Sequence, residues 1–386
     1  MIRRWFKSSL ARTLASTGAA ELLGAARGVR RMPLIVGYHR VVEDFEEAAC
    51  RSIPSLLISR RTFEQHLDWL GRKYRCVSLD ELGTLLERGG GCAGKVAAVT
   101  FDDGYRDVYE QAFPILRRKG IPAAVFVVTD RIGTSRSLVH DRLYSLLLKA
   151  WARWSGPEQT LASLLRDIGV DPPPGYDEQG AVGSPYHATR LLLGKLAQSD
   201  LLAVVGALET RIGVERGEGE GPSVTWEMLA EMRAAGFTIG SHTKSHVVLT
   251  HETRQRVRKE IAESRQALED GLGVPIRHFA YPDGQFHAWT AVAAAIAGYR
   301  FAYTTCRHRS ALFPLLTVPR RVLWERSCLD ARGAFSASVL ACHANGAFDL
   351  AAPCRQNHGG MAAEQSSPVF RGRNHGACGV GGDTAA

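Results

Sequence analysis

Residues 96–105, VAAVTFDDGY, place two adjacent carboxylates directly after a strongly apolar run. A run that is apolar on both faces is typical of a parallel strand covered by helices. In an α/β barrel, residues at the carboxyl ends of the strands point into the active site, and Gly104 permits the sharp turn that follows. Asp102 and Asp103 are therefore candidates for a functional pair, although Asp-Asp-Gly is also a common turn sequence.

Further apolar runs of strand length recur along the chain and alternate with segments of helical period. The runs lie at 33–38, 122–128, 237–241, 278–281, 301–304 and 316–323, and the helical segments at 62–73, 80–88, 107–119, 226–235 and 253–272. Such alternation predicts βαβ units, and seven or eight strands favour a barrel. The expected fold class is α/β, with a TIM-like barrel over residues 33–330.

Two parts of the chain break this rhythm. Residues 140–222 contain three helical patterns separated by linkers rich in proline and glycine. They predict a helical insertion on a barrel loop, where a cap over a site would lie. Residues 331–386 are rich in Ala, Gly, Ser, Cys and His and predict a weakly ordered tail. Their Cys and His spacing is irregular, which favours chance proximity over a metal site.

The charge of the chain is unevenly distributed. The 386 residues include 48 Lys and Arg against 39 Asp and Glu, a net charge of +9. Seven of the basic residues and one acidic residue lie within 1–32, so most of the excess belongs to an N-terminal arm. The body of the chain lacks the basic excess that a nucleic-acid groove requires. No nucleic-acid partner is therefore expected.

The arm has neither the continuous apolar core of a secretory signal nor the 18 apolar residues of a transmembrane helix. Apolar residues at spacing four, namely Phe6, Leu10, Leu14 and Leu22, predict an amphipathic helix. That helix either packs on its own domain or lies on an anionic membrane surface. The eight cysteines include no C-x-x-C pair and favour reduced thiols. We expect a cytoplasmic location, or a peripheral one at the inner membrane surface.

Residues 241–246, SHTKSH, add two imidazoles after another strand-like run. His242 and His246, four residues apart, would lie one above the other on a helical turn, so that both can reach one metal ion. With Asp103 they form a set of two histidines and one carboxylate that leaves an open position for water, as in catalytic zinc sites. Asp102 is then available to deprotonate that water. Two solvent-facing histidines are the alternative for this motif alone.

A third motif lies at residues 277–284, RHFAYPDG. The three motifs, TFDDGY, H-x-x-x-H after a serine, and R-x-F-x-Y-P-x-G, occur in an order that resembles the polysaccharide deacetylase family with the NodB-homology domain, carbohydrate esterase family four. The resemblance covers about residues 33–330, interrupted by the insertion. It implies a distorted (β/α)7 barrel and metal-dependent removal of acetyl groups from N-acetylated sugars.

The resemblance also implies roles for single residues. Asp102 matches the general base. Asp103, His242 and His246 match the ligands of a divalent metal, Zn²⁺ in first place, with Co²⁺, Ni²⁺ or Mn²⁺ as alternatives. Arg277 matches the residue that orients the base and balances its charge.

Other matches concern the substrate and the leaving group. Tyr281 and Pro282 match the wall of the substrate groove, and the backbone N–H of Tyr105 matches a donor to the oxyanion. The general acid of the family is usually the histidine of a Leu-x-His motif near the end of the barrel, but here the nearest candidate is His343 in LACH, where the spacing is off by one residue. The first predicted strand instead ends in YHR, which resembles the branch that deacetylates exopolysaccharide. His39 is therefore favoured as the acid, with His343 second and a structural role of His39 as the alternative.

These matches predict an enzyme that hydrolyses the acetamide of N-acetylhexosamine units to acetate and a free amine. Its partner would be an acetylated polysaccharide or oligosaccharide. The alternative substrate is another glycan, such as peptidoglycan, O-acetyl xylan or a lipid-linked sugar. The shape of the groove decides between them, and the insertion at 140–222 prevents that shape from being inferred from the sequence. A carbohydrate-binding barrel without activity is the alternative from another class, and the three intact ligand positions argue against it.

Overall fold

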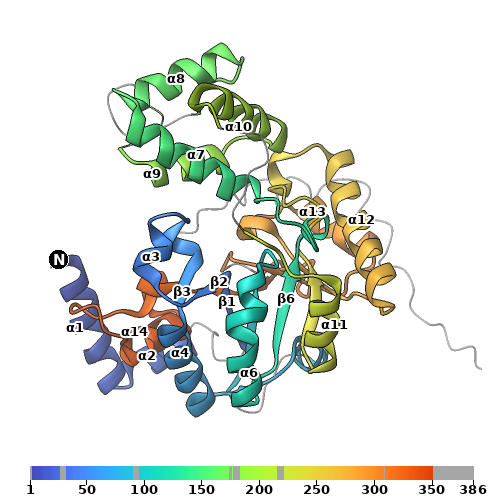
Figure 1. The fold of residues 1–386 in the computed structure, drawn as a ribbon. Coiled ribbons are helices and arrows are strands. Elements are labelled where there is room, and N and C mark those ends of the chain that lie inside the picture. Colours follow the sequence, from blue (N-terminus) through green and yellow to red (C-terminus); the bar gives the residue numbers. More distant parts are fainter. Residues whose placement is uncertain are drawn as a thin grey trace, which may run out of the picture.

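The computed structural model describes residues 2–26, 32–89, 95–173, 176, 183–214, 221–307 and 309–350. Within these ranges the chain forms a barrel, a helical insertion and a smaller helical layer that contains α1 and α14 (Figure 1). None of the helices in the described ranges combines the length and the apolar composition that crossing a membrane requires.

The barrel consists of parallel strands that are almost completely buried. They are β1 (Leu34–Tyr38), β5 (Val96–Phe101), β6 (Ala123–Val127), β7 (Thr238–Ser241), β8 (His278–Ala280) and β9 (Phe301–Thr304), with β4 (Arg75–Cys76) paired to β5 as a branch. Neighbours follow the order β9-β8-β7-β6-β5-β1, and every pair is parallel. The expected α/β class and distorted seven-stranded barrel are confirmed.

One short segment closes the ring of strands. β10 (Val318–Pro319) pairs with β9, and β11 (Arg321–Val322) pairs with β1 directly afterwards. Arg320, between them, donates its backbone N–H to Thr304 O at 2.7 Å. The single strand expected at 316–323 is therefore a seam that turns from one neighbour to the other, and Arg320 lies at the turn.

Helices cover the outside of the barrel. They are α4 (Arg60–Lys73), α5 (Leu79–Glu87), α6 (Phe113–Lys119), α11 (Trp226–Ala234), α12 (Arg254–Leu272) and α13 (Ala288–Ile296). Four of them begin at a hydroxyl side chain that accepts a backbone N–H of the first turn: Ser59, Ser78, Thr225 and Thr253. The helix expected at 107–119 starts as a π-helical turn, Val108–Ala112, before α6.

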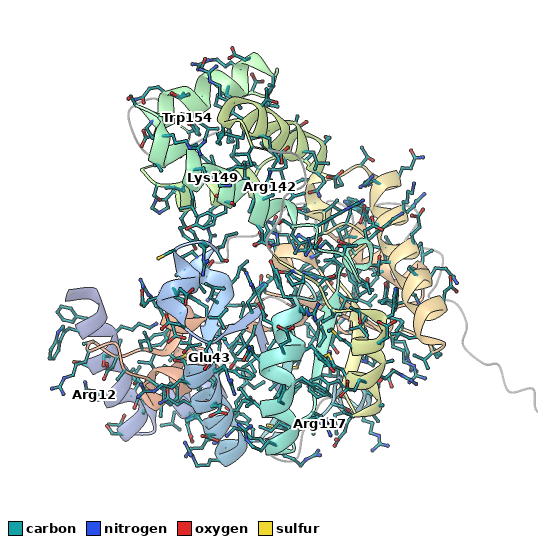
Figure 2. All side chains as sticks on the ribbon, viewed as in Figure 1. Arg12, Glu43, Arg117, Arg142, Lys149 and Trp154 are labelled. Carbon is teal, nitrogen blue, oxygen red and sulfur yellow. The ribbon has the colours of Figure 1, made fainter. Side chains whose placement is uncertain are left out.

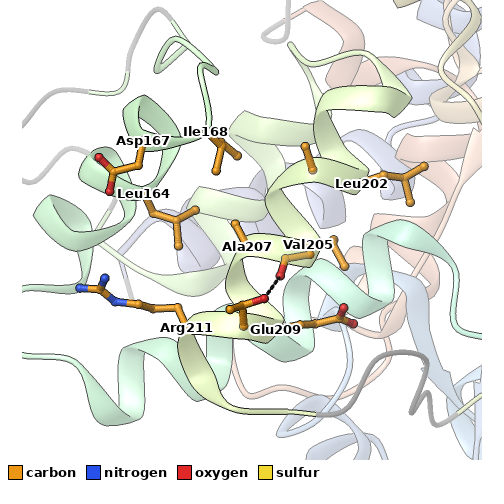
Figure 3. A pocket seen from close by; sticks show the side chains of 11 residues that line it. Leu164, Asp167, Ile168, Leu202, Val205, Ala207, Glu209 and Arg211 are labelled. Atoms are coloured by element: carbon orange, nitrogen blue, oxygen red, sulfur yellow. Dashed lines mark hydrogen bonds between the residues drawn. The ribbon is translucent and has the colours of Figure 1, made fainter.

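The described residues of the insertion form four helices and a hydrophobic core of their own. The helices are α7 (Val139–Arg153), α8 (Pro157–Asp167), α9 (Pro185–Leu193) and α10 (Gln198–Ile212). Arg142, labelled in Figure 2, donates to Glu209 Oε1 at 2.8 Å across α7 and α10. A groove between α8 and α10 is lined by Leu164, Ile168 and Leu202, among others, and by none of the predicted site residues (Figure 3).

The N-terminal arm forms two helices instead of one. α1 (Ile2–Ser16) and α2 (Ala19–Ala26) meet at Gly18, whose φ of 71° ends the first helix. α1 packs against α14 (Ala337–Ala344), which lies in the tail that was expected to be weakly ordered. The tail is therefore helical next to the arm, and residues 351–386 lie outside the described part of the chain.

Candidate metal centre and active site

The candidate ligands lie in loops at the carboxyl ends of two strands. Asp103 follows β5, and His242 and His246 follow β7. Asp103, Thr243 and His246 have φ values of 73°, 68° and 61°, a left-handed conformation that residues other than glycine rarely adopt. The histidines therefore converge through a strained loop and not through the helical turn that their spacing suggested. Strain of this kind is frequent at functional sites.

Three side chains form a cluster that fits a divalent metal. One ligand atom from each of Asp103, His242 and His246 lies within 4.8 Å of the others. Asp103 Oδ1 is 3.1 Å from His246 Nε2 and 3.4 Å from His242 Nε2. That oxygen is buried and forms no hydrogen bond with the described residues, which is costly for a carboxylate. A cation between the oxygen and the two nitrogens would satisfy all three atoms, and this donor set is typical of catalytic zinc.

Hydrogen bonds from neighbouring elements hold the histidine loop. His242 Nδ1 lies 2.8 Å from Ala280 O, so Nδ1 carries the proton and Nε2 is free to bind a metal. The backbone N–H and the hydroxyl of Ser245 both donate to the carboxylate of Glu260 on α12, at 2.8 and 2.7 Å. Burial lowers the pKa of His242 to about 4, so its ring is neutral at pH 7, as a metal ligand must be.

Asp102 is paired with Arg320 and not with Arg277. Arg320 Nη1 and Nη2 donate to the two carboxylate oxygens of Asp102 at 2.7 Å each, and both side chains are buried. Arg277 is exposed at the amino end of β8, where, together with His278, it lowers the pKa of Asp80. The prediction that Arg277 orients Asp102 is therefore wrong.

The positions of the strands explain this correction. β8 is separated from β5 by β7 and β6, so the two strands lie three spacings of about 4.8 Å apart. Arg277 also precedes β8, whereas Asp102 follows β5 and lies at the opposite end of the barrel. The seam that carries Arg320 is separated from β5 only by β1. The sequence contains two adjacent arginines, Arg320 and Arg321, and no local pattern indicates which of the two side chains points into the barrel.

Nearby charges keep both carboxylates ionised. Burial would raise the pKa of Asp102, but the charge and the hydrogen bonds of Arg320 outweigh it, and the pKa is lower than that of an ordinary aspartate. Burial likewise opposes ionisation of Asp103, but His246 in particular brings its pKa well below the ordinary value. Near neutral pH one carboxylate is thus able to accept a proton and the other to bind a cation.

The two candidates for the general acid occupy different places. His39 follows β1 and is partly buried, and it comes directly after Tyr38, whose backbone oxygen accepts the N–H of Asp102 at 3.0 Å. The Nδ1 atom of His39 is buried and forms no hydrogen bond within the described residues. His343 lies on α14 beside the arm, with Nε2 3.1 Å from Ser327 O. The structure therefore brings His39 to the site and leaves His343 outside it.

Tyr281 and Pro282 are buried, so the prediction that they form a groove wall is wrong. The hydroxyl of Tyr281 donates to Leu316 O at 3.0 Å, and its ring packs edge-on against Phe279. The apolar part of the third motif thus belongs to the core of the barrel. A motif that is shared for packing reasons cannot be distinguished in a sequence from one that touches substrate.

The turn after Asp103 brings a further histidine to the site. The backbone N–H of Tyr105, the predicted oxyanion donor, gives no hydrogen bond to a backbone oxygen of the described residues. Its hydroxyl lies 2.9 Å from His140 Nε2, and the His140 ring centroid is 4.9 Å from that of His246. Sequence reasoning missed His140, which belongs to no motif. The feature of the sequence that could have indicated His140 is its position at the start of the helical insertion.

Known proteins resemble this chain over the barrel. Residues 90–147 and 184–302 match the family described as polysaccharide deacetylase. YxkH of Bacillus subtilis (strain 168), provisionally named a polysaccharide deacetylase, is 22% identical over 252 residues, which are 65% of this chain and 60% of that protein. The poly-beta-1,6-N-acetyl-D-glucosamine N-deacetylase of Staphylococcus epidermidis is 28% identical over 110 residues, 26% of this chain and 38% of that protein.

The chain thus spans less than two thirds of the length of either relative. Among solved structures, IcaB from Ammonifex degensii matches with a TM-score of 0.49 and 22% identity, over 81% of this chain and 97% of that one.

Proposed function

Because the chain belongs to the polysaccharide deacetylase family, as its three motifs predicted, we propose that it hydrolyses the acetamide of N-acetylhexosamine units in a polysaccharide. The products are acetate and a free amine on the sugar. One observation carries this proposal, namely the buried Asp102–Arg320 pair beside the cluster of Asp103, His242 and His246. This site combines an ionised carboxylate that can accept a proton with three candidate metal ligands, and metal-assisted amide hydrolysis requires both.

The proposed substrate class is an exopolysaccharide of N-acetylglucosamine. The support for this class comes from the Staphylococcus epidermidis and Staphylococcus aureus relatives, which are named as poly-beta-1,6-N-acetyl-D-glucosamine N-deacetylases. The YHR segment at residues 38–40 supports the same class, since it resembles the branch of the family that deacetylates exopolysaccharide.

The attack on the acetyl group involves Asp102. A divalent cation on the three ligands would polarise the acetyl carbonyl and lower the pKa of water. Zn²⁺ is proposed first because two imidazole nitrogens and one carboxylate oxygen are its usual catalytic set. Asp102 accepts the proton of the water molecule that attacks the carbonyl carbon. Arg320 holds the Asp102 carboxylate in one orientation through two parallel hydrogen bonds.

The release of the amine involves two other groups. The backbone N–H of Tyr105 donates to the carbonyl oxygen as negative charge develops on it. His39 donates a proton to the sugar nitrogen while the C–N bond breaks, so that a neutral amine leaves and acetate remains. One water and one amide thus give one neutral amine and one acetic acid, which releases its proton to solvent and leaves as acetate.

The proposal is tested by acetate release from poly-β-1,6-N-acetylglucosamine and from chito-oligosaccharides. We expect release that requires added Zn²⁺ or Co²⁺ and that a chelator stops. Asp102→Asn should reduce the rate by at least about 100-fold, because general-base catalysis contributes that much. Asp68→Asn, on the exposed outside of α4, is the matched control. Full activity of Asp102→Asn, or a folded wild type that binds metal but deacetylates no glycan, would refute the proposal.

We also propose that the arm contacts an anionic membrane surface. Trp5, Phe6 and Leu10 on α1 are 55%, 73% and 54% exposed, and Leu22 on α2 is 68% exposed. Large apolar side chains in this number, with the exposed Arg12 on α1, are suited to the interface of a negatively charged bilayer. Flotation with vesicles of phosphatidylglycerol should recover the protein, and Phe6→Ser with Leu10→Ser should abolish recovery. Equal recovery of both proteins would refute this contact.

A further inference from the structure

The helical insertion begins at the metal cluster. His140 and Asp141 lie in the first turn of α7, and the remainder of that helix packs against α9 and α10 in the core of the insertion. His140 is only 6% exposed, and the Asp141 side chain is 15% exposed. The first turn of α7 is therefore the point at which the insertion reaches the candidate active site.

A chain of hydrogen bonds fixes the orientation of His140. The Tyr105 hydroxyl lies 2.6 Å from Asp141 Oδ2, which can only accept, so the hydroxyl donates to it. The same phenol oxygen lies 2.9 Å from His140 Nε2, and it accepts a hydrogen bond from that nitrogen. The proton of His140 is thereby placed on Nε2. Arg40, 4.9 Å above the Tyr105 ring, adds a cation–π contact that helps to hold the phenol.

His140 in turn packs against two of the candidate metal ligands. Its ring meets the His246 ring edge-on, with centroids 4.9 Å apart and an interplanar angle of 63°. Its Nε2 lies 3.9 Å from Asp103 Oδ2, whereas His242 Nε2 and His246 Nε2 lie near the other carboxylate oxygen, Oδ1. A buried ring in this place restricts rotation of both Asp103 and His246. Because Nε2 carries a proton, His140 is not itself a ligand through that atom.

We propose that His140 is a positioning residue of the metal centre, held by Tyr105 and Asp141, and that the insertion completes the centre through it. The inference rests on the proposed function only in that it requires a divalent cation to bind the cluster. Groups that orient metal ligands typically contribute 10- to 100-fold to metal affinity. We therefore expect the insertion to influence metal binding even though its core lies apart from the ligands.

The test is the affinity of the metal-free full-length protein for Zn²⁺, measured by competition with a chromophoric chelator. His140→Gln and Tyr105→Phe should each weaken binding by about 10- to 100-fold. The double variant should lose little more than the worse single variant, because both residues act in one chain of contacts. The visible spectrum of bound Co²⁺ should also change in both single variants, since the geometry of the ligands changes. His187→Gln, an exposed histidine on α9 of the same insertion, should change neither the affinity nor the spectrum.

Thermal unfolding in the presence of chelator separates positioning from folding. Positioning predicts that metal-free Tyr105→Phe, which lacks a single oxygen atom, unfolds close to the wild-type temperature. Wild-type affinity and spectrum in both His140→Gln and Tyr105→Phe would overturn the inference. So would a loss of affinity that is matched by unfolding of the metal-free variants. A wild-type protein that binds neither Zn²⁺ nor Co²⁺ would instead refute the proposed function.

Discussion

The pair of Asp102 and Arg320 predicts a specific pattern of stability when its charges are removed. The two hydrogen bonds are 2.7 Å long, and the side chains are 5% and 0% exposed. Arg320 Nη1 also donates to Thr100 Oγ1 at 3.1 Å, so the guanidinium is held from two sides. Arg320→Met and Asp102→Asn, made singly and together, therefore show how the stability depends on each charge and on their pairing.

Each single substitution leaves one uncompensated charge in the barrel. Removing one partner of a buried pair costs about 3–5 kcal/mol of unfolding free energy. If the two costs were independent, the double variant would lose about 6–10 kcal/mol. In the double variant, however, no unpaired charge remains. Its cost falls to that of an unpaired buried amide, about 1–3 kcal/mol. The double variant should therefore be more stable than either single variant.

Urea unfolding followed by tryptophan fluorescence measures these differences, with chelator present so that metal binding does not contribute. The control is Arg60→Met, which removes an arginine that pairs with Glu43 at 3.0 Å on the surface, with side chains 41% and 74% exposed. An exposed pair contributes about 0–1 kcal/mol. The reasoning is refuted if Arg320→Met costs no more than Arg60→Met, or if the double variant loses the sum of the single losses.

Three further outcomes follow from the structure. His39→Gln should lower the rate of acetate release by about 100-fold or more, while His343→Gln should leave it unchanged; equal rates would contradict the assignment of the acid. Burial lowers the pKa of His66 to about 3, so below pH 6.5 the unfolded chain binds a proton that the folded chain does not. His66 should therefore contribute about 2 kcal/mol to the unfolding free energy that is lost from pH 6.5 to 5, and urea unfolding should show the loss smaller by that amount in His66→Leu; an equal loss in the variant would contradict this. Gly284→Ala should lower the free energy of unfolding by at least about 1–3 kcal/mol, because φ is 67° and a Cβ would clash with the backbone and side chain of Thr305; wild-type urea unfolding would contradict this.

The sequence predicted the barrel because its strands are apolar on both faces. β5 and β9 have the bounds that their apolar runs predicted, and Thr225 and Thr253 cap the helices that follow them. These features depend on neighbours in the chain, so local periodicity reveals them. The same holds for Asp103, which is placed by the end of its strand and by the turn at Gly104.

The residues that sequence reasoning misplaced depend on contacts between distant segments. Arg277 and Arg320 are both arginines next to short strands, and only the strand order shows that Arg320 is near Asp102. Likewise, Tyr281 has the composition of a substrate-binding residue but lies in the core. His140 reaches the site because α7 begins at the barrel rim, which no motif records. Local pattern therefore identified the three side chains of the cluster, Asp103, His242 and His246, whereas the groups that surround them required the three-dimensional arrangement.

Closure of the barrel and pairing of the proposed base depend on the same residues. β10 and β11 join β9 to β1, and Arg320 between them bonds Thr304 through its backbone and Asp102 through its side chain. If the seam opened, Asp102 would lose the cation that opposes the effect of its burial. An arginine suits this position because it stays charged when buried and is long enough to reach past β1 to Asp102. Its planar guanidinium then donates two hydrogen bonds to that carboxylate. Lysine could supply a charge there but not the planar pair of bonds, so the seam sets the orientation of the base as well as its ionisation.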